Sequence, residues 1–307
     1  MNQSFHPLVS IIIPVYNGSN FVGQAIDSAL AQTYDNIEII VVNDGSKDDG
    51  ATEAIALQYG DKIRYFRKAN GGVSSALNFG IDKMRGEYFS WLSHDDLYEP
   101  TKVEREVDAL RKLDTPKKSI VVCADTLIDK DGKEIFHPVQ RLNGVFAGKD
   151  VFDIFFTRHI VINGCTLLIP KSAFSDFGGF GKFRYIQDIE RWITFMLADI
   201  TFCFLPDKLV KMRVHPGQVT QRMPELYFVE MAEFSSSIID NYIAQGKLSD
   251  SNLKSFLCFQ YKNRNKSIYQ RIEQITGYSS SIRKFGYILY GILFDCTKSL
   301  YKKFIKR

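Results

Sequence analysis

The sequence lacks the features that mark several classes of protein. Its best apolar run near the C-terminus, residues 287–294, is short and interrupted by Gly291, whereas a transmembrane helix needs roughly 20 apolar residues. The five cysteines are odd in number and form no CxxC pair, so we expect neither a zinc cage nor a disulfide framework. The N-terminus has no basic stretch followed by a long apolar core, so we expect no secretory signal. These absences favour a protein of the reducing cytoplasm.

Positive charge is concentrated at one end of the chain. The formal net charge is +4, but residues 221–307 hold 14 lysines and arginines against 7 aspartates and glutamates. Residues 281–307 combine this charge with apolar residues at helical spacing, a basic amphipathic pattern. The pattern indicates either attachment to an anionic membrane surface, with a peripheral location on its inner face, or a helix packed on the rest of the chain. It does not indicate a nucleic-acid groove, and we expect no nucleic-acid partner.

Apolar and polar residues alternate in blocks that predict an α/β fold. Strand-like runs at residues 9–13, 37–42, 63–66 and 88–92 are separated by three helix-like runs. This order predicts a Rossmann-like, mostly parallel sheet flanked by helices. From about residue 119 the elements become shorter, and after Pro224 the pattern is helical. We therefore expect an α/β domain over residues 1–220 and a helical C-terminal region over residues 221–307.

Polar residues follow three of the predicted strands at the point where each strand ends. The three segments are Pro14–Asn17, Asn43–Ser46 and Ser93–Asp96. Ligands of open α/β sheets bind beyond the carboxyl ends of parallel strands, near a topological switch point. The sequence therefore predicts one shared crevice, and the carboxylates in two segments indicate a ligand that offers hydrogen bonds and a cation.

Seven motifs, in their order along residues 8–220, together resemble those of family 2 glycosyltransferases, which have the GT-A fold. The motifs are Ser10–Asn17, Asn43–Ser46, Asn70–Asn78, Asp95-Asp96, Gly178-Gly179-Phe180, Gln187-Asp188 with Trp192, and Arg213-Val214-His215. The resemblance is to enzymes that build bacterial surface polysaccharides. It implies transfer of a sugar, with inversion, from a nucleotide diphosphate sugar, expected to be a UDP-sugar, to a hydroxyl of a glycan or lipid-linked acceptor.

The resemblance also implies which residues bind the nucleotide. They are Pro14, Val15, Tyr16, Asn17, Asp44, Asn70, Gly71 and Asp95. Asp44 would accept a hydrogen bond from the N–H of a uracil-like base, although an Asx turn on its own backbone would use the same side chain. Asn70 and Gly71 precede a predicted helix whose N-terminus favours negative charge, and helix capping is the alternative. No GK[ST] sequence occurs, so this segment is not a Walker loop.

Asp95 and Asp96 stand where the family has its DxD-type metal motif. Two adjacent carboxylates repel each other unless a cation lies nearby, and hard oxygen ligands favour Mg²⁺ or Mn²⁺. Ser93 occupies the position that is often the first aspartate, so Asp95 is expected at the ribose or the metal and Asp96 at the metal. His215 resembles a late family histidine that contacts metal or diphosphate. A helix-capping aspartate pair and a structural histidine are the alternatives.

Asp188 matches the catalytic aspartate of the family. It would take the proton from the acceptor hydroxyl, although an N-capping aspartate would look the same in the sequence. Trp192 and Gly164 are expected at the acceptor, with core packing as the alternative for Trp192.

Two other classes of function are compatible with parts of this pattern. A nucleotidyltransferase would be expected to show a glycine-rich basic loop after the first strand, and residues 15–19 contain no lysine or arginine. The second class is a non-catalytic protein that binds glycans or nucleotide sugars, which would need no residues for sugar transfer. The presence of Asp44, Asp95, Asp96 and Asp188 together favours an enzyme.

Overall fold

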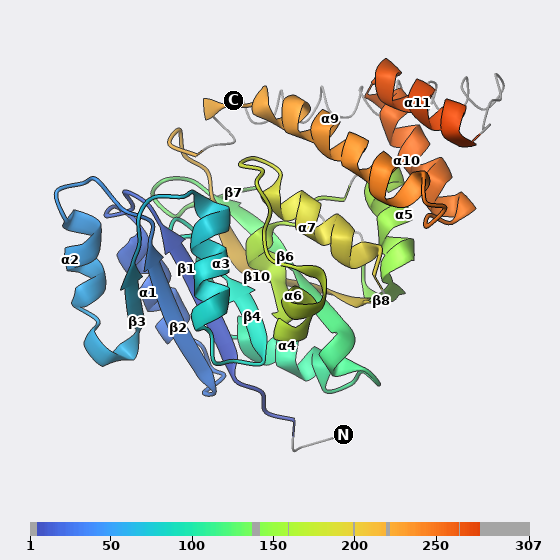
Figure 1. Cartoon of the computed structure of the whole chain (residues 1–307). Helices are drawn as coiled ribbons and strands as arrows, with labels where there is room; N and C mark the ends of the chain where they lie inside the picture. Colours follow the sequence, from blue (N-terminus) through green and yellow to red (C-terminus); the bar gives the residue numbers. More distant parts are fainter. Residues whose placement is uncertain are drawn as a thin grey trace. The chain divides into compact units, whose positions relative to one another are not determined.

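The computed structural model describes residues 5–136, 142–158, 160–198, 200–218, 222–263 and 265–276. The chain forms two compact units (Figure 1). The first consists of Met1–Gly148 and Ile162–Pro224, and the second of Lys149–Val161 and Glu225–Arg307. The sequence placed one boundary at residue 220 and did not anticipate that residues 149–161 belong to the second unit. The basic segment 281–307 lies outside the described residues.

The first unit begins with four parallel strands. They are β1 (Val9–Val15), β2 (Ile37–Asn43), β3 (Arg64–Arg67) and β4 (Tyr88–Trp91), in the spatial order β3-β2-β1-β4. Every residue of β1 is buried, as its run of valine and isoleucine predicts for a strand that is covered on both faces. The chain adds β2 and β3 on one side of β1 and returns to place β4 on the other. The switch point, where ligands of such sheets bind, therefore lies between β1 and β4.

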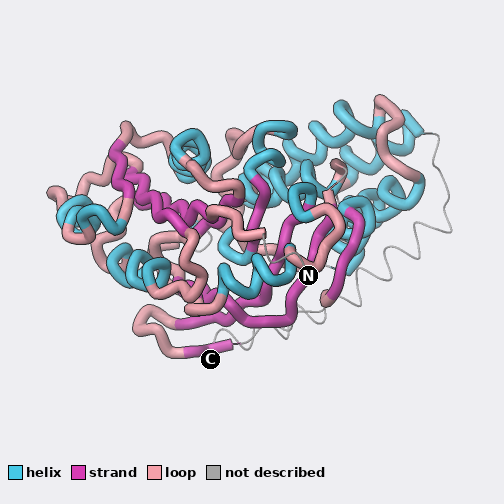
Figure 2. Tube along the Cα trace, turned by 90° about the horizontal axis from the view of Figure 1, so that it is seen from below, coloured by secondary structure: helices cyan, strands magenta, loops and turns pink. Residues whose placement is uncertain are grey.

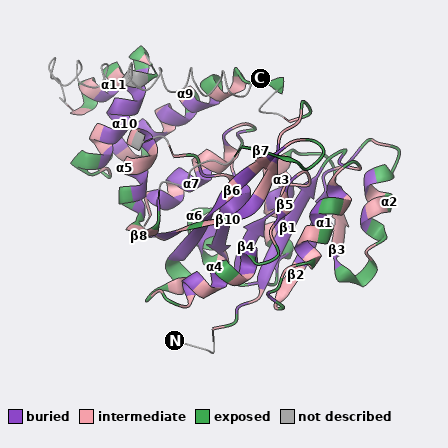
Figure 3. Cartoon of the chain, turned by 180° about the vertical axis from the view of Figure 1, so that it is seen from behind, coloured by how far each residue is buried: buried purple, intermediate pink, exposed green. Residues whose placement is uncertain are grey.

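Helices cover both faces of these strands. They are α1 (Val22–Leu30), α2 (Ala51–Leu57) and α3 (Val73–Lys83). Helix α3 packs on β1 and β2 and lies in front of them in Figure 1, whereas Figure 3, from the opposite side, shows α1 in front. The buried residues of α1 are Val22, Ala25, Ile26 and Ala29, which recur at helical spacing.

The remaining strands extend the same sheet in mixed directions. They are β5 (Leu97–Tyr98), β6 (Ser119–Ile128), β7 (Glu134–Phe136), β8 (Gly144–Ala147), β9 (Leu167–Pro170) and β10 (Thr201–Arg213). Strand β9 is antiparallel to β4 and β6, while β6 and β10 are parallel. Helices α4 (Lys102–Leu110), α6 (Lys171–Phe177) and α7 (Gln187–Met196) complete this part, and Figure 2 shows helices on both sides of the strands. The α/β prediction is confirmed.

Strand β10 runs from Thr201 to Arg213 and contains Pro206. The register with β6 shifts between Phe204 and Lys208, and such an irregularity is where a strand tolerates proline.

The described part of the second unit is helical. Its elements are α5 (Gly148–Arg158), α9 (Leu226–Ile238), the π-helical turn η4 (Ile239–Ile243), α10 (Asp250–Lys262) and α11 (Lys266–Thr276). Phe156 of α5 packs against Phe256 and Phe259 of α10, with ring centroids 5.3 and 4.9 Å apart. Across the portion of the chain that the structure describes, none of the helices has the length and apolar character to cross a membrane.

Candidate active site

The polar segments after β1 and β2 contact each other directly. The backbone N–H of Asp44 donates to the carbonyl of Val15 at 2.8 Å. The N–H of Asn17 donates to Ser46 Oγ at 2.9 Å, and Asn17 Oδ1 accepts from the N–H of Lys47 at 2.7 Å. Asn17 has φ +50°, in the left-handed region that asparagine tolerates better than most residues. The two turns therefore form one rigid edge at the carboxyl ends of the strands.

The side chain of Asp44 holds the loop between β3 and α3. Its carboxylate accepts hydrogen bonds from Lys68 Nζ at 2.6 Å and from the N–H groups of Gly71 and Gly72, the latter at 2.7 Å. Its backbone carbonyl accepts from Asn70 Nδ2 at 2.8 Å. These bonds link two of the predicted motifs through a buried carboxylate. The base-recognition role of Asp44 stays a prediction. The side chain does not form the Asx turn given above as the alternative, because it bonds to Lys68, Gly71 and Gly72 instead.

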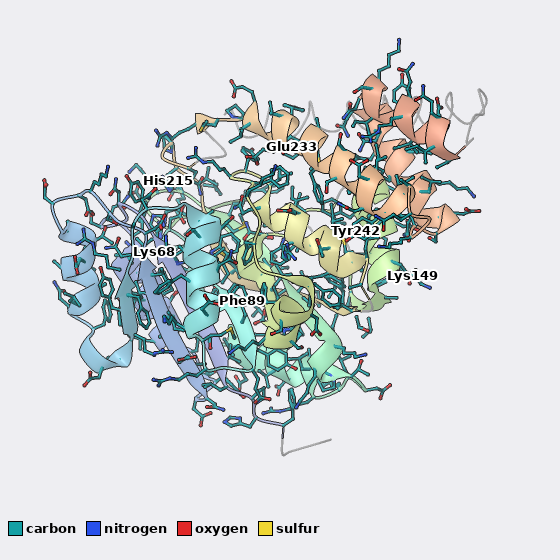
Figure 4. The ribbon with its side chains drawn as sticks, viewed as in Figure 1. Lys68, Phe89, Lys149, His215, Glu233 and Tyr242 are labelled. Carbon is teal, nitrogen blue, oxygen red and sulfur yellow. The ribbon has the colours of Figure 1, made fainter. Side chains whose placement is uncertain are left out.

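Asp95 and His215 lie together, although 120 residues separate them. Nε2 of His215 is 3.0 Å from Oδ2 of Asp95, and Gln218 Nε2 donates to the same oxygen at 3.3 Å. His94 lies on the other side, with Nδ1 4.0 Å from Asp95 Oδ1. Figure 4 shows His215 and Lys68 beyond the ends of the strands, with Phe89 further down among them. The structure thus brings two of the predicted metal ligands to one place.

Asp96 has a different environment from its neighbour. Its Oδ1 accepts from the backbone N–H of Arg213 at 2.8 Å, and its Oδ2 accepts from the Cys165 thiol at 3.2 Å. Burial, together with the charge of Asp95, raises the pKa of Asp96 well above its usual range. Because both oxygens are engaged by buried protein groups, this geometry argues against the metal-ligand role predicted for Asp96. The pair lies in a turn closed by a hydrogen bond from the Asp96 N–H to the carbonyl of Ser93, and the two side chains have different partners.

Arg213 organises the surrounding loops, and sequence reasoning assigned it no role beyond its motif. The side chain is 1% exposed. Its Nε donates to the carbonyl of Asp95 at 2.8 Å, Nη1 to the carbonyl of Lys130 at 2.9 Å, and Nη2 to Gln24 Oε1 at 2.9 Å. The guanidinium also lies over the Phe21 ring at 4.4 Å. Arg213 therefore joins α1, the Asp95 loop and the turn after β6.

The Asp95–His215 pair fits a divalent cation that takes its remaining ligands from a diphosphate. The two atoms are 3.0 Å apart, a hydrogen-bond separation, and a carboxylate oxygen and an imidazole nitrogen are both groups that bind divalent cations. Within residues 5–136, 142–158, 160–198, 200–218, 222–263 and 265–276, no group of three or more His, Cys, Asp and Glu could hold a metal. Mg²⁺ at nucleotide sites commonly uses one or two carboxylates with substrate phosphates, so a full protein cage is not required.

Asp188 is in the first turn of α7 and is half-buried. Its Oδ1 accepts a hydrogen bond from the N–H of Ile189 at 2.8 Å. Burial raises its pKa from 3.8 to about 6, while hydrogen bonds from the backbone N–H groups of Ile189 and Asp188 act in the opposite direction. A carboxylate with this pKa is ionised at neutral pH and is a stronger base than an ordinary aspartate, as a general base requires.

Asn78 of α3 fixes the segment that leads to Asp188. Its Nδ2 donates to the carbonyl of Phe180, and its Oδ1 accepts from the N–H of the same residue, both at 2.8 Å. A Cβ at Gly179 would lie 2.3 Å from Asn78 Oδ1, so only glycine allows this approach. Phe180 in turn packs on Trp91 at the end of β4, with ring centroids 5.8 Å apart. The third and fifth motifs are thus in contact, which the sequence did not reveal.

The acceptor roles of Trp192 and Gly164 stay predictions, and both residues lie in the core. Trp192 is fully buried and packs against Phe180 and Phe195, with ring centroids 6.0 and 6.1 Å apart. Gly164 is also buried, and a Cβ there would lie 2.3 Å from the Trp91 ring. This burial favours the core-packing alternative for Trp192, and the close approach of Gly164 to the Trp91 ring requires glycine.

Comparison with known sequences agrees with this arrangement. The profile described as Glycosyl transferase family 2 matches residues 10–176. An uncharacterized glycosyltransferase of Rickettsia typhi is 53% identical over 71% of this chain and 67% of its own length, and one of Rickettsia bellii is 50% identical over 72% of this chain but 32% of its own length. The minor teichoic acid biosynthesis protein GgaB of Bacillus subtilis is 34% identical over 56% of this chain and 19% of its own length. The chain thus spans between about a fifth and two thirds of these relatives.

A solved structure shares the fold. S. aureus TarS 1-349, crystallised in complex with UDP-GlcNAc, superposes with a TM-score of 0.65 at 14% identity, over 92% of this chain and 89% of that one. This similarity confirms the GT-A type fold.

Proposed function

The chain belongs to glycosyl transferase family 2, and from this we infer that it transfers a sugar from a nucleotide diphosphate sugar to a hydroxyl of a glycan or lipid-linked acceptor. The observation that carries the proposal is the contact between Asp95 and His215 at the switch point of the sheet. UDP is the proposed nucleotide because TarS, which has the same fold, was crystallised with UDP and with UDP-GlcNAc.

The nucleotide would bind beyond the ends of β1 and β2. Residues Pro14–Asn17 and Asp44 border this space, and the turn at Asn70 and Gly71 closes one side of it through its bonds to Asp44. Lys68 lies at the same place, where its ammonium group forms an ion pair with the Asp44 carboxylate.

Asp95 and His215 would hold Mg²⁺ or Mn²⁺ beside the diphosphate. When bound, such an ion offsets the negative charge that develops on the leaving group. The protein's own contribution is to fix the Asp95 loop, through Arg213 and through the bonds of Asp96 to residues 165 and 213. Asp96 thus supports the site instead of binding the metal.

Asp188 would accept the proton of the acceptor hydroxyl. The hydroxyl oxygen forms its bond to the anomeric carbon as the bond to the diphosphate breaks, so the configuration inverts and the nucleoside diphosphate leaves. This step needs the carboxylate within about 2.6–3.2 Å of the hydroxyl oxygen in the reactive complex.

Metal-dependent donor binding tests the proposal directly. Isothermal calorimetry with UDP should show tighter binding in Mn²⁺ than in EDTA, and Asp95→Asn should remove that difference. A thermal-shift screen of nucleotide sugars in Mn²⁺ would identify the donor. Slow release of UDP from that donor by water would establish an enzyme, whereas binding without any turnover would indicate a non-catalytic binding protein. Equal UDP affinity with and without metal would refute the proposed role of Asp95 and His215.

The basic segment 281–307, outside the described residues, supports a proposal about location. Its amphipathic sequence fits an anionic membrane surface, where a lipid-linked acceptor would be available. Flotation with anionic liposomes should recover the full chain and not a chain that ends at Ser280, and equal recovery would reject the idea.

A further inference from the structure

A fully buried ion pair lies in helix α4, shortly after the loop that carries Asp95. Lys102 Nζ is 2.9 Å from both carboxylate oxygens of Glu106, and neither side chain is exposed. Burial raises the pKa of Glu106 to about 6 even though Lys102 opposes this. Replacing a buried ion pair by apolar residues of similar volume is often neutral or stabilising. Stability alone therefore does not account for this pair.

The ammonium group of Lys102 begins a chain of hydrogen bonds. Lys102 Nζ donates to Ser90 Oγ at 3.2 Å, Ser90 Oγ is 2.8 Å from the Tyr98 hydroxyl, and this hydroxyl donates to the carbonyl of Trp91 at 2.6 Å. An ammonium group can only donate, and the single proton of the Tyr98 hydroxyl is used on Trp91. Ser90 must therefore donate to Tyr98. All the bonds run in one direction, so each polarises the next.

This series of hydrogen bonds closes the base of the loop that carries Asp95. Trp91 is the last residue of β4 and Tyr98 the last of β5, so the Tyr98 hydroxyl joins the two ends of residues 92–97. Strand β5 pairs with β10 and not with β4, so no ladder between the two strands makes this link. The Lys102 ammonium also lies 4.3 Å from the centre of the Tyr98 ring, so it contacts the ring directly and the hydroxyl through Ser90.

We propose that the chain from Glu106 through Lys102, Ser90 and Tyr98 to Trp91 positions Asp95 for metal-dependent binding of the donor. Tyr98 and Lys102 are then positioning residues, since neither touches the ligand. The inference rests on the proposed role of Asp95 at the metal. Mg²⁺ requires near-ideal ligand geometry, so a loosened loop weakens binding in the presence of metal and leaves metal-free binding of UDP unchanged.

Tyr98→Phe tests this role against a matched control. Tyr88 is the first residue of β4, the strand that ends at Trp91, is buried like Tyr98, and donates its hydroxyl proton to the carbonyl of Pro116 at 2.9 Å. Tyr88→Phe therefore removes a similar bond at the opposite end of the strand. Calorimetry with UDP in Mn²⁺ and in EDTA should show about two- to tenfold weaker binding for Tyr98→Phe in Mn²⁺ only, and no change for Tyr88→Phe. Both variants should show similar losses of melting temperature.

The double variant Lys102→Met/Glu106→Leu separates positioning from stability. Its melting temperature should equal or exceed that of the wild type, because the buried charges are gone, while its metal-dependent affinity for UDP falls. Wild-type affinity in Tyr98→Phe, or in a folded double variant, would overturn the inference. Asp95→Asn identifies which idea has failed. If Asp95→Asn abolishes the metal dependence of UDP binding and Tyr98→Phe does not reduce that dependence, only the positioning role is wrong. If UDP binding by Asp95→Asn still depends on metal, the proposed metal site is wrong. The positioning inference, which rests on that site, is then wrong too.

Discussion

Replacing Asp188 by asparagine removes one charge and almost nothing else. The amide oxygen of asparagine can still accept the hydrogen bond from the Ile189 N–H that Asp188 Oδ1 accepts at 2.8 Å. Asparagine, however, cannot take a proton from an acceptor hydroxyl. General base catalysis contributes typically about 10²–10⁴-fold. We therefore expect Asp188→Asn to lower the turnover number about 10²–10⁴-fold and to leave the affinity for UDP unchanged.

The same substitution should stabilise the protein at neutral pH. Burial raises the pKa of Asp188 from 3.8 to about 6, which corresponds to about 3 kcal/mol against the ionised form in the folded state. Partial exposure and the favourable charge at the N-terminus of α7 reduce this to about 1–2 kcal/mol. Because the pKa of Asp188 is higher in the folded state than in the unfolded state, the wild type loses about this much free energy of unfolding as the pH rises from about 4 through about 6. The difference between variant and wild type should appear over that interval and persist above it.

Two measurements check the reasoning. Release of UDP from the donor identified by the thermal-shift screen gives turnover, and urea denaturation at pH 4 and pH 8 gives the free energy of unfolding. Asp176→Asn, which removes an exposed carboxylate of α6, is the control and should change neither quantity. Turnover of Asp188→Asn within threefold of the wild type would refute the role of Asp188 as base. Reduced stability at pH 8 would show that its carboxylate is a helix-capping group.

Three further outcomes are expected. Wild-type turnover should rise with pH and level off above about 6, because the base must be ionised, and a profile flat from pH 5 to 8 would exclude Asp188. Asn78→Ala should reduce turnover more than UDP affinity, because it releases Phe180 and the segment before α7. Steady-state kinetics and calorimetry measure the two quantities, and a larger loss of UDP affinity than of turnover would mean that Asn78 holds the nucleotide. Gly45→Ala should destabilise the fold by about 2 kcal/mol or more in urea denaturation, since Gly45 has φ +71° and a Cβ would lie 2.8 Å from the Asn70 nitrogen; an unchanged midpoint would contradict this.

The parts of the fold and site that local patterns specify could be predicted. Burial on both faces requires continuous apolar runs in β1 and β2, and these runs are visible in the sequence. The segments that contain Asn17 and Asp44 follow these runs, and the segment that contains Asp95 follows the run of β4, so their place at the carboxyl ends of strands was predictable. The Cys165 thiol on Asp96 was not, because 69 residues separate them and no local periodicity encodes that contact.

The sequence by itself determined the order of strands and helices, the family, and the edge of the sheet where polar groups gather, because short-range sterics and apolar burial act along the chain. Only the tertiary structure decided which polar groups face the crevice. It paired Asp95 with His215, turned Asp96 toward Arg213, and buried Trp192 among aromatic rings. These outcomes depend on packing between segments that are distant in the sequence, where neighbouring residues with the same chemistry can point to opposite sides.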